Sequence, residues 1–101
     1  MAGVVRRGIA VALLLILAAC GSGPPVQEMS DARQAIAVAK EAGAEDHAAE
    51  TLRDAEALLE SAQQNLSDRA YGQARRDALK AKLKALDALA IAENPEQKEQ
   101  P

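Results

Sequence analysis

The stretch AYGQARRDALKAKLKALDALAIA, residues 70–92, decides the fold that this sequence predicts. It contains no proline and consists mostly of Ala, Leu, Lys and Arg, which are strong helix formers. At about 100° per residue its apolar residues form two lines along one helix. The alanine line consists of Tyr71, Ala74, Ala78, Ala81, Ala85, Ala88 and Ala92. The leucine line lies about 140° away and consists of Leu79, Leu83, Leu86 and Ala90.

These two lines constrain how the helix packs. Alanine allows a close approach of two helices, whereas leucine needs a deeper groove, so one neighbouring helix cannot cover both lines. Either two other helices of the chain take one line each, or one line is left for a partner. A small helical domain without a disulfide is marginally stable, and the partner could therefore be a second copy or another protein.

The preceding residues predict a second helix over 47–66, with Asp46 as its N-cap. Its apolar residues are spaced four and three apart, as in a heptad seam, and they are Ala48, Leu52, Ala55, Leu59, Ala62 and Leu66. The intervening loop, 67–69, is short enough to fold the third helix back antiparallel to the second.

A first helix is predicted over 29–42, with Ser30 or Asp31 as N-cap and Gly43 as the left-handed residue that ends it. β-branched residues are scarce between residues 29 and 92, so strands are not expected there. The predicted fold is all-α, a short antiparallel helical hairpin or three-helix bundle over about 29–42, 47–66 and 70–92.

The segments on both sides of this helical domain, 29–92, differ from it in composition. Residues 20–28 are rich in Gly and Pro and predict a flexible linker, and the charged residues 93–101 predict a disordered tail. Residues 1–19 have the parts of a secretory signal peptide: the basic pair Arg6 and Arg7, then an apolar run too short to span a membrane.

The end of that signal carries the most specific motif of the chain. Leu17-Ala18-Ala19-Cys20 resembles the lipobox of bacterial lipoproteins. This resemblance implies cleavage between Ala19 and Cys20 and attachment of fatty acids, palmitate among them, to Cys20. The acyl chains would anchor the protein in a membrane. Cys20 is the only cysteine, so no intrachain disulfide can form.

The net charge of the cleaved chain and the residue after Cys20 indicate which partners and which location to expect. After cleavage, ten Lys and Arg (twelve less Arg6 and Arg7) face fifteen Asp and Glu, a net charge of −5. An acidic balance argues against nucleic acid and against anionic lipid surfaces as electrostatic partners. Gly21 in place of Asp resembles the pattern of lipoproteins sent to the outer membrane, so we expect its periplasmic face.

Two sets of polar residues are candidates for metal binding or catalysis. His47 lies near acids but has no second His or free Cys beside it, so a solvated histidine is the better interpretation than a metal ligand. Glu56 and Glu60 fall on one exposed helical face rather than in a cleft, which argues against paired catalytic carboxylates. We therefore expect no enzyme, no catalytic or metal-binding residue, no cofactor and no small-molecule substrate.

The basic residues of the third helix allow two interpretations. They are Arg75, Arg76, Lys80, Lys82 and Lys84. They can form a solvated face that is partly neutralised by Asp77 and Asp87, or they can contact phosphate groups or an acidic envelope partner. No aromatic residue interleaves with them, which argues against nucleic acid.

The helical segments also resemble a known family. The segments concerned are Ala32-Arg33-Gln34-Ala35-Ile36, Ala39 to Ala44, Leu52 to Glu56, Leu59 to Ala62, Tyr71 to Arg75 and the spaced alanines that follow. Together they resemble bacterial domain of unknown function family 4398, whose members look like short helical lipoproteins. Some members add a peptidoglycan-binding domain after this region; we expect none here, so peptidoglycan binding is not carried over.

Two functions follow as expectations. The first is a lipid-anchored structural or protein-interaction module in the periplasm. The alternative is an oligomeric coiled-coil spacer between outer membrane and cell wall, resembling small alanine- and leucine-rich lipoproteins. In that family a C-terminal lysine is bound covalently to the wall. The last lysine here is Lys98, and Glu99-Gln100-Pro101 follow it, so the resemblance does not extend to this covalent bond.

Overall fold

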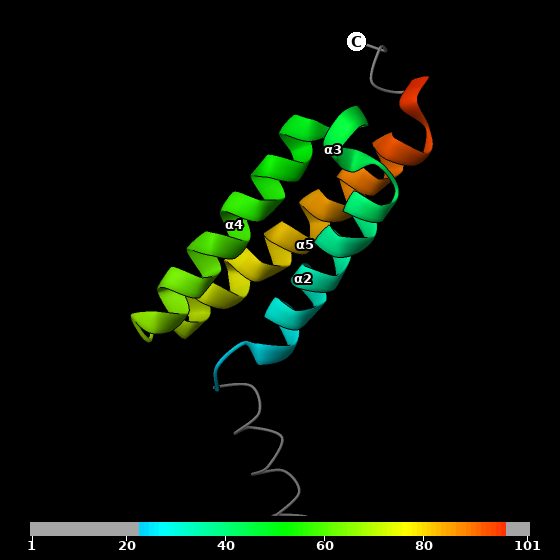
Figure 1. The fold of residues 1–101 in the computed structure, drawn as a ribbon. Coiled ribbons are helices and arrows are strands. Elements are labelled where there is room, and N and C mark those ends of the chain that lie inside the picture. Colours follow the sequence, from blue (N-terminus) through cyan, green and yellow to red (C-terminus); the bar gives the residue numbers. More distant parts are fainter. Residues whose placement is uncertain (1–22, 97–101) are drawn as a thin grey trace, which may run out of the picture.

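Four helices form an up-down-up bundle in the computed structural model, which describes residues 23–96 (Figure 1). Helix α2, Val26–Glu41, runs up in this view, and the single turn α3, Ala44–His47, connects it to the next helix. Helix α4, Ala49–Ser67, runs down, and α5, Tyr71–Glu93, runs up again. No strand occurs between residues 23 and 96. The predicted all-α bundle is therefore confirmed.

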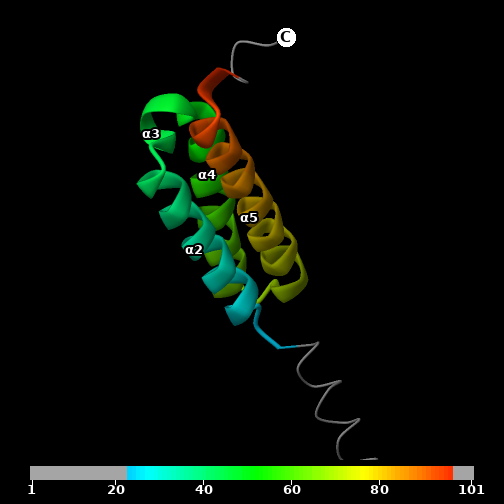
Figure 2. The same cartoon turned by 90° about the vertical axis from the view of Figure 1, so that its right-hand side faces the viewer.

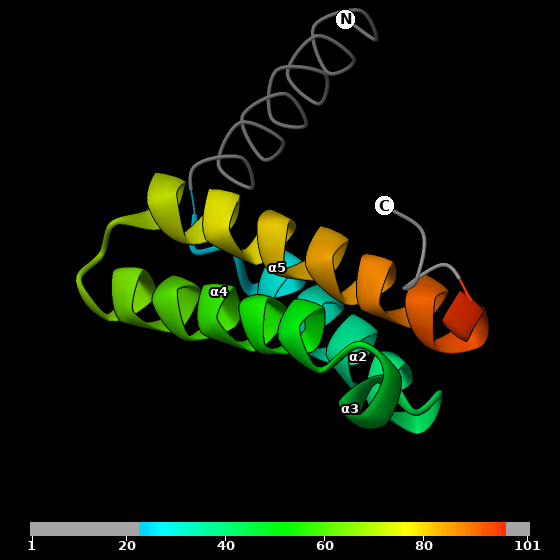
Figure 3. The same cartoon turned by 90° about the horizontal axis from the view of Figure 1, so that it is seen from above.

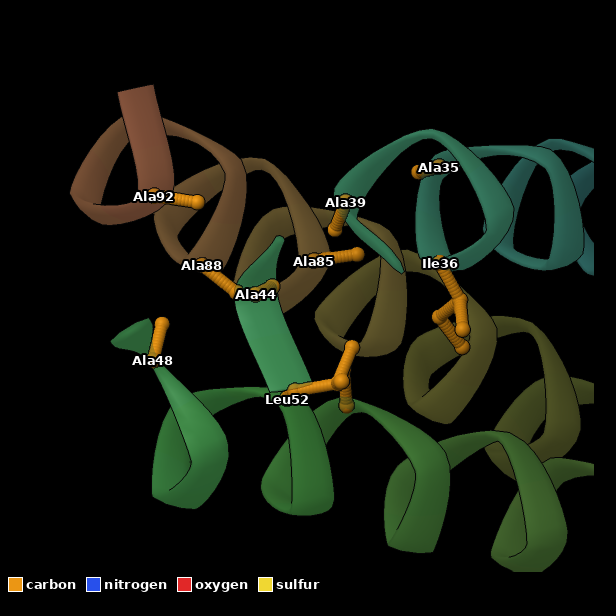
Figure 4. Close-up of a cluster of buried hydrophobic side chains, with 10 residues drawn as sticks. Ala35, Ile36, Ala39, Ala44, Ala48, Leu52, Ala85, Ala88 and Ala92 are labelled. Carbon is orange, nitrogen blue, oxygen red and sulfur yellow. The ribbon is translucent and has the colours of Figure 1, made fainter. Parts of the chain in front are cut away.

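Helix α5 lies against both other long helices. Figure 3 shows α4 antiparallel beside it, and Figure 2 shows α2 and α5 running in the same direction. The core lies where the three helices meet and is made largely of alanine. Its larger cluster joins α2, α3, α4 and α5, and nine of its members are labelled in Figure 4: Ala35, Ile36, Ala39, Ala44, Ala48, Leu52, Ala85, Ala88 and Ala92.

The alanine line of α5 supplies most of that helix's buried surface. Every alanine of the line is buried, whereas Tyr71 is only half-buried. Because an alanine side chain ends at Cβ, the facing backbones can come close, and both α2 and α4 fit against one side of α5. The larger side chains Met29, Ile36 and Leu52 fill the space that remains between the helices.

The helix starts differ from those predicted. Helix α2 begins at Val26, and Pro25 rather than Ser30 or Asp31 is its N-cap. Proline suits the start of a helix because its φ is fixed near the helical value. The predicted linker, 20–28, is accordingly too long, since its last three residues belong to α2.

The connection between α2 and α4 contains a short helix, α3, that the sequence did not predict. Gly43 does end α2 in the left-handed conformation, with φ of 92°, but it also opens the short helix α3. Asp46 lies in the first turn of α3, and the residue that precedes α4 is Ala48, which makes no side-chain cap. The prediction of Asp46 as the cap of a helix over 47–66 was therefore wrong.

The turn between α4 and α5 follows the expected antiparallel return. Arg69 has a positive φ of 60°. Its N–H donates to the Leu66 carbonyl at 3.0 Å, and the N–H of Ala70 donates to the Asn65 carbonyl at 2.8 Å. These two bonds form a Schellman motif, which satisfies the last carbonyls of α4 and reverses the chain.

Candidate functional surface

The lipobox residues Leu17, Ala18, Ala19 and Cys20 lie outside the described residues, but the structure shows how the chain just after them joins the bundle. The Arg75 guanidinium donates from Nη2 to the Gly23 carbonyl at 2.8 Å and from Nε to Glu28 Oε1 at 3.2 Å. Pro25 is fully buried. The first described residues are therefore fixed to the start of α5, and Figures 1–3 show them beside its first turns.

This attachment shortens the distance from Cys20 to the fold. Gly23 is only three residues after Cys20, and three residues span at most about 10 Å. The predicted linker would have reached about twice as far. A membrane anchor at Cys20 would thus hold the bundle close to the bilayer, at the end where α5 begins.

A buried carboxylate links α4 with α5. Asp77 is only 5% exposed, and its Oδ2 accepts hydrogen bonds from Ser61 Oγ at 2.7 Å and Asn65 Nδ2 at 2.8 Å. Its Oδ1 accepts one from Gln73 Nε2 at 2.8 Å. A buried charge is tolerated when its oxygens are satisfied in this way. Asp77 therefore fixes the register of α4 against α5.

The pKa of Asp77 reflects two opposing effects. Burial raises the pKa by disfavouring the charged form, but the hydrogen bonds from Ser61, Gln73 and Asn65, with the nearby charge of Lys80, lower it more. The net result is a pKa below the ordinary value. The carboxylate therefore stays ionised at neutral pH, which makes it a structural acceptor rather than a proton donor.

Sequence reasoning missed this role, because it placed Asp77 at the edge of a solvated basic face. A signal was present in the spacing. Asp77 lies three residues after Ala74 and four before Ala81, which puts it on the buried alanine side of the helix. Ser61 and Asn65, four residues apart on α4, present two donors on one face. A buried acid opposite two such donors is a recognisable pattern.

The other titratable residues that the sequence singled out lie at the surface. His47 is exposed at the end of α3, and residues 23–96 contain no group of three His, Cys, Asp or Glu side chains suited to a metal ion. Glu56 pairs with Lys40 of α2 at 2.9 Å rather than with Glu60. The hydrogen bond and charge of Glu56 raise the pKa of Lys40. This ion pair joins α2 to α4 across the surface.

The leucine line of α5 is the most prominent exposed apolar feature. Leu79, Leu83 and Leu86 are 45%, 66% and 42% exposed. A shallow groove of about 600 Å³ lies beside the line, between α4 and α5. It is lined by Leu58, Lys80, Leu83, Lys84, Leu86 and Asp87. Of the two alternatives for covering both lines, the structure excludes the first, because α2 and α4 share the alanine line and leave the leucine line uncovered.

Charge is distributed unevenly over this surface. Helix α5 carries five Lys and Arg against three Asp and Glu, a net charge of +2. Helix α4 carries four acids against one Arg, a net charge of −3. The overall negative charge therefore coexists with an excess of cations on α5.

Among residues 23–96 no helix combines the length and the apolar character that crossing a membrane requires. Comparison of the chain with known protein families, with curated proteins and with solved structures found no match. The features that bear on function are therefore the motif at Cys20 and the surfaces of the bundle.

Proposed function

We propose that this protein is a lipid-anchored component of a bacterial envelope, attached through Cys20 to the periplasmic face of the outer membrane. There it acts as a structural or protein-interaction module. The observation that carries the proposal is the sequence Leu17-Ala18-Ala19-Cys20 directly before a folded domain. The resemblance to domain of unknown function family 4398 is part of the same proposal.

The arrangement of the bundle supports such a role. The chain joins the fold at Gly23, three residues after the proposed lipid site, and Arg75 and the buried Pro25 hold it there. A domain whose polar network serves to align two helices, and which exposes three leucines on one helix face, is suited to docking on a protein or membrane surface. Large exposed apolar patches mark interaction surfaces in proteins of this size.

The alternative function, a coiled-coil spacer, finds less support. The longest helix has 23 residues, about 35 Å at 1.5 Å per residue. The breaks at Gly43 and Arg69 fold the chain back on itself rather than extending it. A spacer would need several copies of this bundle end to end, and no feature of the described residues favours that assembly over the simpler module.

Fatty-acid labelling in cells tests the proposal. We expect the wild-type chain to take up labelled palmitate and to be found in the membrane fraction. The variant Cys20→Ser should take up no label and should leave the membrane fraction or remain as the uncut precursor. Ser22→Ala, two residues further on, is the matched control and should behave as wild type. Equal labelling and processing of Cys20→Ser and wild type would refute lipid attachment at this position.

A further inference from the structure

The leucine line of α5 has the form of a membrane-surface helix. Leu79, Leu83 and Leu86 are spaced four and three residues apart, so they follow one face of the helix. Figures 2 and 3 show α5 along one side of the bundle, with α2 and α4 both on its other side. The leucines therefore lie on the side of α5 that faces away from α2 and α4.

Cations border this line on both sides. At about 100° per residue, Lys80 and Arg76 flank it on the side of α4, and Lys82 flanks it on the side of α2. None of these three makes an ion pair within residues 23–96. Three acids also lie near, Asp77 and Asp87 beside Lys80, and Asp31 beside Lys82. Lys84 lines the same groove, so four cations stand against these three acids, and the border carries an excess of positive charge, which complements the phosphate groups of lipids.

The attachment point of the chain lies on the same line. Arg75, which holds Gly23, is one helical turn before Leu79 and two turns before Leu83. The site of acylation, three residues before Gly23, is therefore within about 10 Å of Gly23, which Arg75 holds one helical turn before the leucine line begins. Acyl chains fixed there place a bilayer at the end of the bundle from which the leucine line runs.

A second copy fits this face less well. In a symmetric dimer through the leucine line, the cations that border the line in one copy would face those of the other. Like charges directly opposed disfavour such a contact. A bilayer presents anionic phosphates to both borders at once and accepts the leucines between them.

From these observations we propose that α5 lies on the bilayer in which Cys20 is anchored, with Leu79, Leu83 and Leu86 at the boundary of headgroups and acyl chains. Lys80 and Lys82 reach the phosphates on either side, since long basic side chains can extend from an apolar face to polar groups. The inference rests on lipid attachment at Cys20. The protein is then held flat on the membrane and not suspended from it.

The test uses the lipidated protein in vesicles of phosphatidylethanolamine and phosphatidylglycerol. Acylation occupies the thiol of Cys20, so a cysteine introduced by Leu83→Cys can be labelled alone with an environment-sensitive fluorophore. Gln64→Cys is the matched control, because Gln64 is exposed on the face of α4 opposite its buried alanines. We expect a blue-shifted emission and quenching by spin-labelled lipid at position 83, and an aqueous signal at position 64.

Charge variants test the role of the lysines. In the labelled protein, Lys80→Gln should reduce the ratio of docked to undocked α5 about fivefold, as expected for one basic residue near an anionic surface. Arg53→Gln on α4 removes the same charge at a distance from the leucine line and should leave the ratio unchanged. Equal effects of the two substitutions would show that general charge, and not this face, attracts the bilayer.

The outcomes separate this inference from the proposed function. A protein that floats with the vesicles but gives an aqueous signal at both labelled positions would overturn the docking of α5 and leave lipid attachment intact. Failure to associate with vesicles, together with the absence of fatty acid, would overturn lipid attachment itself. Protection of position 83 that increases with protein density, with energy transfer between labelled chains, would show that a second copy covers the face and would overturn the bilayer as its occupant.

Discussion

The alanine face and the leucine face of α5 have opposite relations to the fold, although they lie on one helix. The alanine face is almost completely buried and meets two helices at once. The leucine face carries the larger side chains and remains exposed. In most small domains the larger apolar residues of a helix are the buried ones. The comparison shows that close backbone approach, not apolar volume, selects the face that α5 turns inward.

This choice has a consequence for stability. An alanine core buries little apolar area per residue, so the bundle depends on tight fit and on a few polar contacts such as those of Asp77. The leucines, which would bury more area, are left available for something outside the chain. Paired substitutions at buried and exposed positions test this difference between the two faces.

The largest difference is expected between Ala85→Leu and Leu83→Ala. Ala85 is fully buried beside Ala39 and Ala44, as Figure 4 shows, and a longer side chain there forces helices apart. We expect a loss of about 1–3 kcal/mol in the free energy of unfolding. Leu83→Ala, on the exposed face, should change it by less than about 0.5 kcal/mol. Urea unfolding followed by circular dichroism measures both, and similar losses would mean that the leucine face is buried.

The second comparison concerns two acids, Asp77 and Asp87. Asp77→Ala removes the acceptor shared by Ser61, Asn65 and Gln73, and we expect a loss of about 1–2 kcal/mol because these donors lose a charged partner. Asp87→Ala, at an exposed position of the same helix, should have almost no effect. The same urea unfolding experiment applies. If Asp77→Ala were as stable as wild type, the buried network would not align α4 with α5.

The third comparison concerns two cations, Arg75 and Lys82. Arg75→Gln removes the contacts with Gly23 and Glu28, and we expect a loss of about 1 kcal/mol because the ion pair is partly exposed. Amide hydrogen exchange should increase at residues 23–29 in this variant. Lys82→Gln should leave exchange there unchanged. Equal exchange in both variants would show that Arg75 does not hold the start of the fold.

The smallest expected effect is the pH dependence of the stabilisation by Asp77, which should hardly change the unfolding free energy between neutral pH and about pH 5. Because its folded pKa lies below the ordinary value, its contribution to stability is fully present above the unfolded pKa of about 3.9 and is lost as the pH falls through the folded pKa. The difference in unfolding free energy between wild type and Asp77→Asn should stay constant from neutral pH to about pH 5 and shrink below pH 4. A difference that grew on acidification would contradict a lowered pKa.

The sequence predicted the helices and the two lines of α5, because helix propensity and spacing act locally. Residues such as Ala81 and Leu83 differ in sequence by two positions but in direction by about 200°, and that alone separates the faces. Which line turns inward could not be predicted, since it depends on how closely α2 and α4 approach. The structure answers this with the exposed Leu83 and the buried Ala81.

Other features escaped prediction for identifiable reasons. Ser30, Asp31 and Asp46 were good capping residues by type, but tertiary contacts placed the helix starts elsewhere, at Val26 and Ala49. Pro25 was interpreted as part of a linker because Gly and Pro at that density favour one, but it is buried between Gly23 and Glu28, which both contact Arg75, about 50 residues away in the sequence. Asp77 was assigned to the surface because charged residues mostly lie there.

The mass of the intact protein extracted from cell membranes tests the central claim most directly, namely that acyl chains on Cys20 hold this bundle at a bilayer. The account predicts a chain that begins at Cys20 and carries added mass equal to a diacylglycerol group, with or without a further fatty acid on the new amino terminus. A mature chain that begins at or after Cys20 without any acyl mass would contradict it.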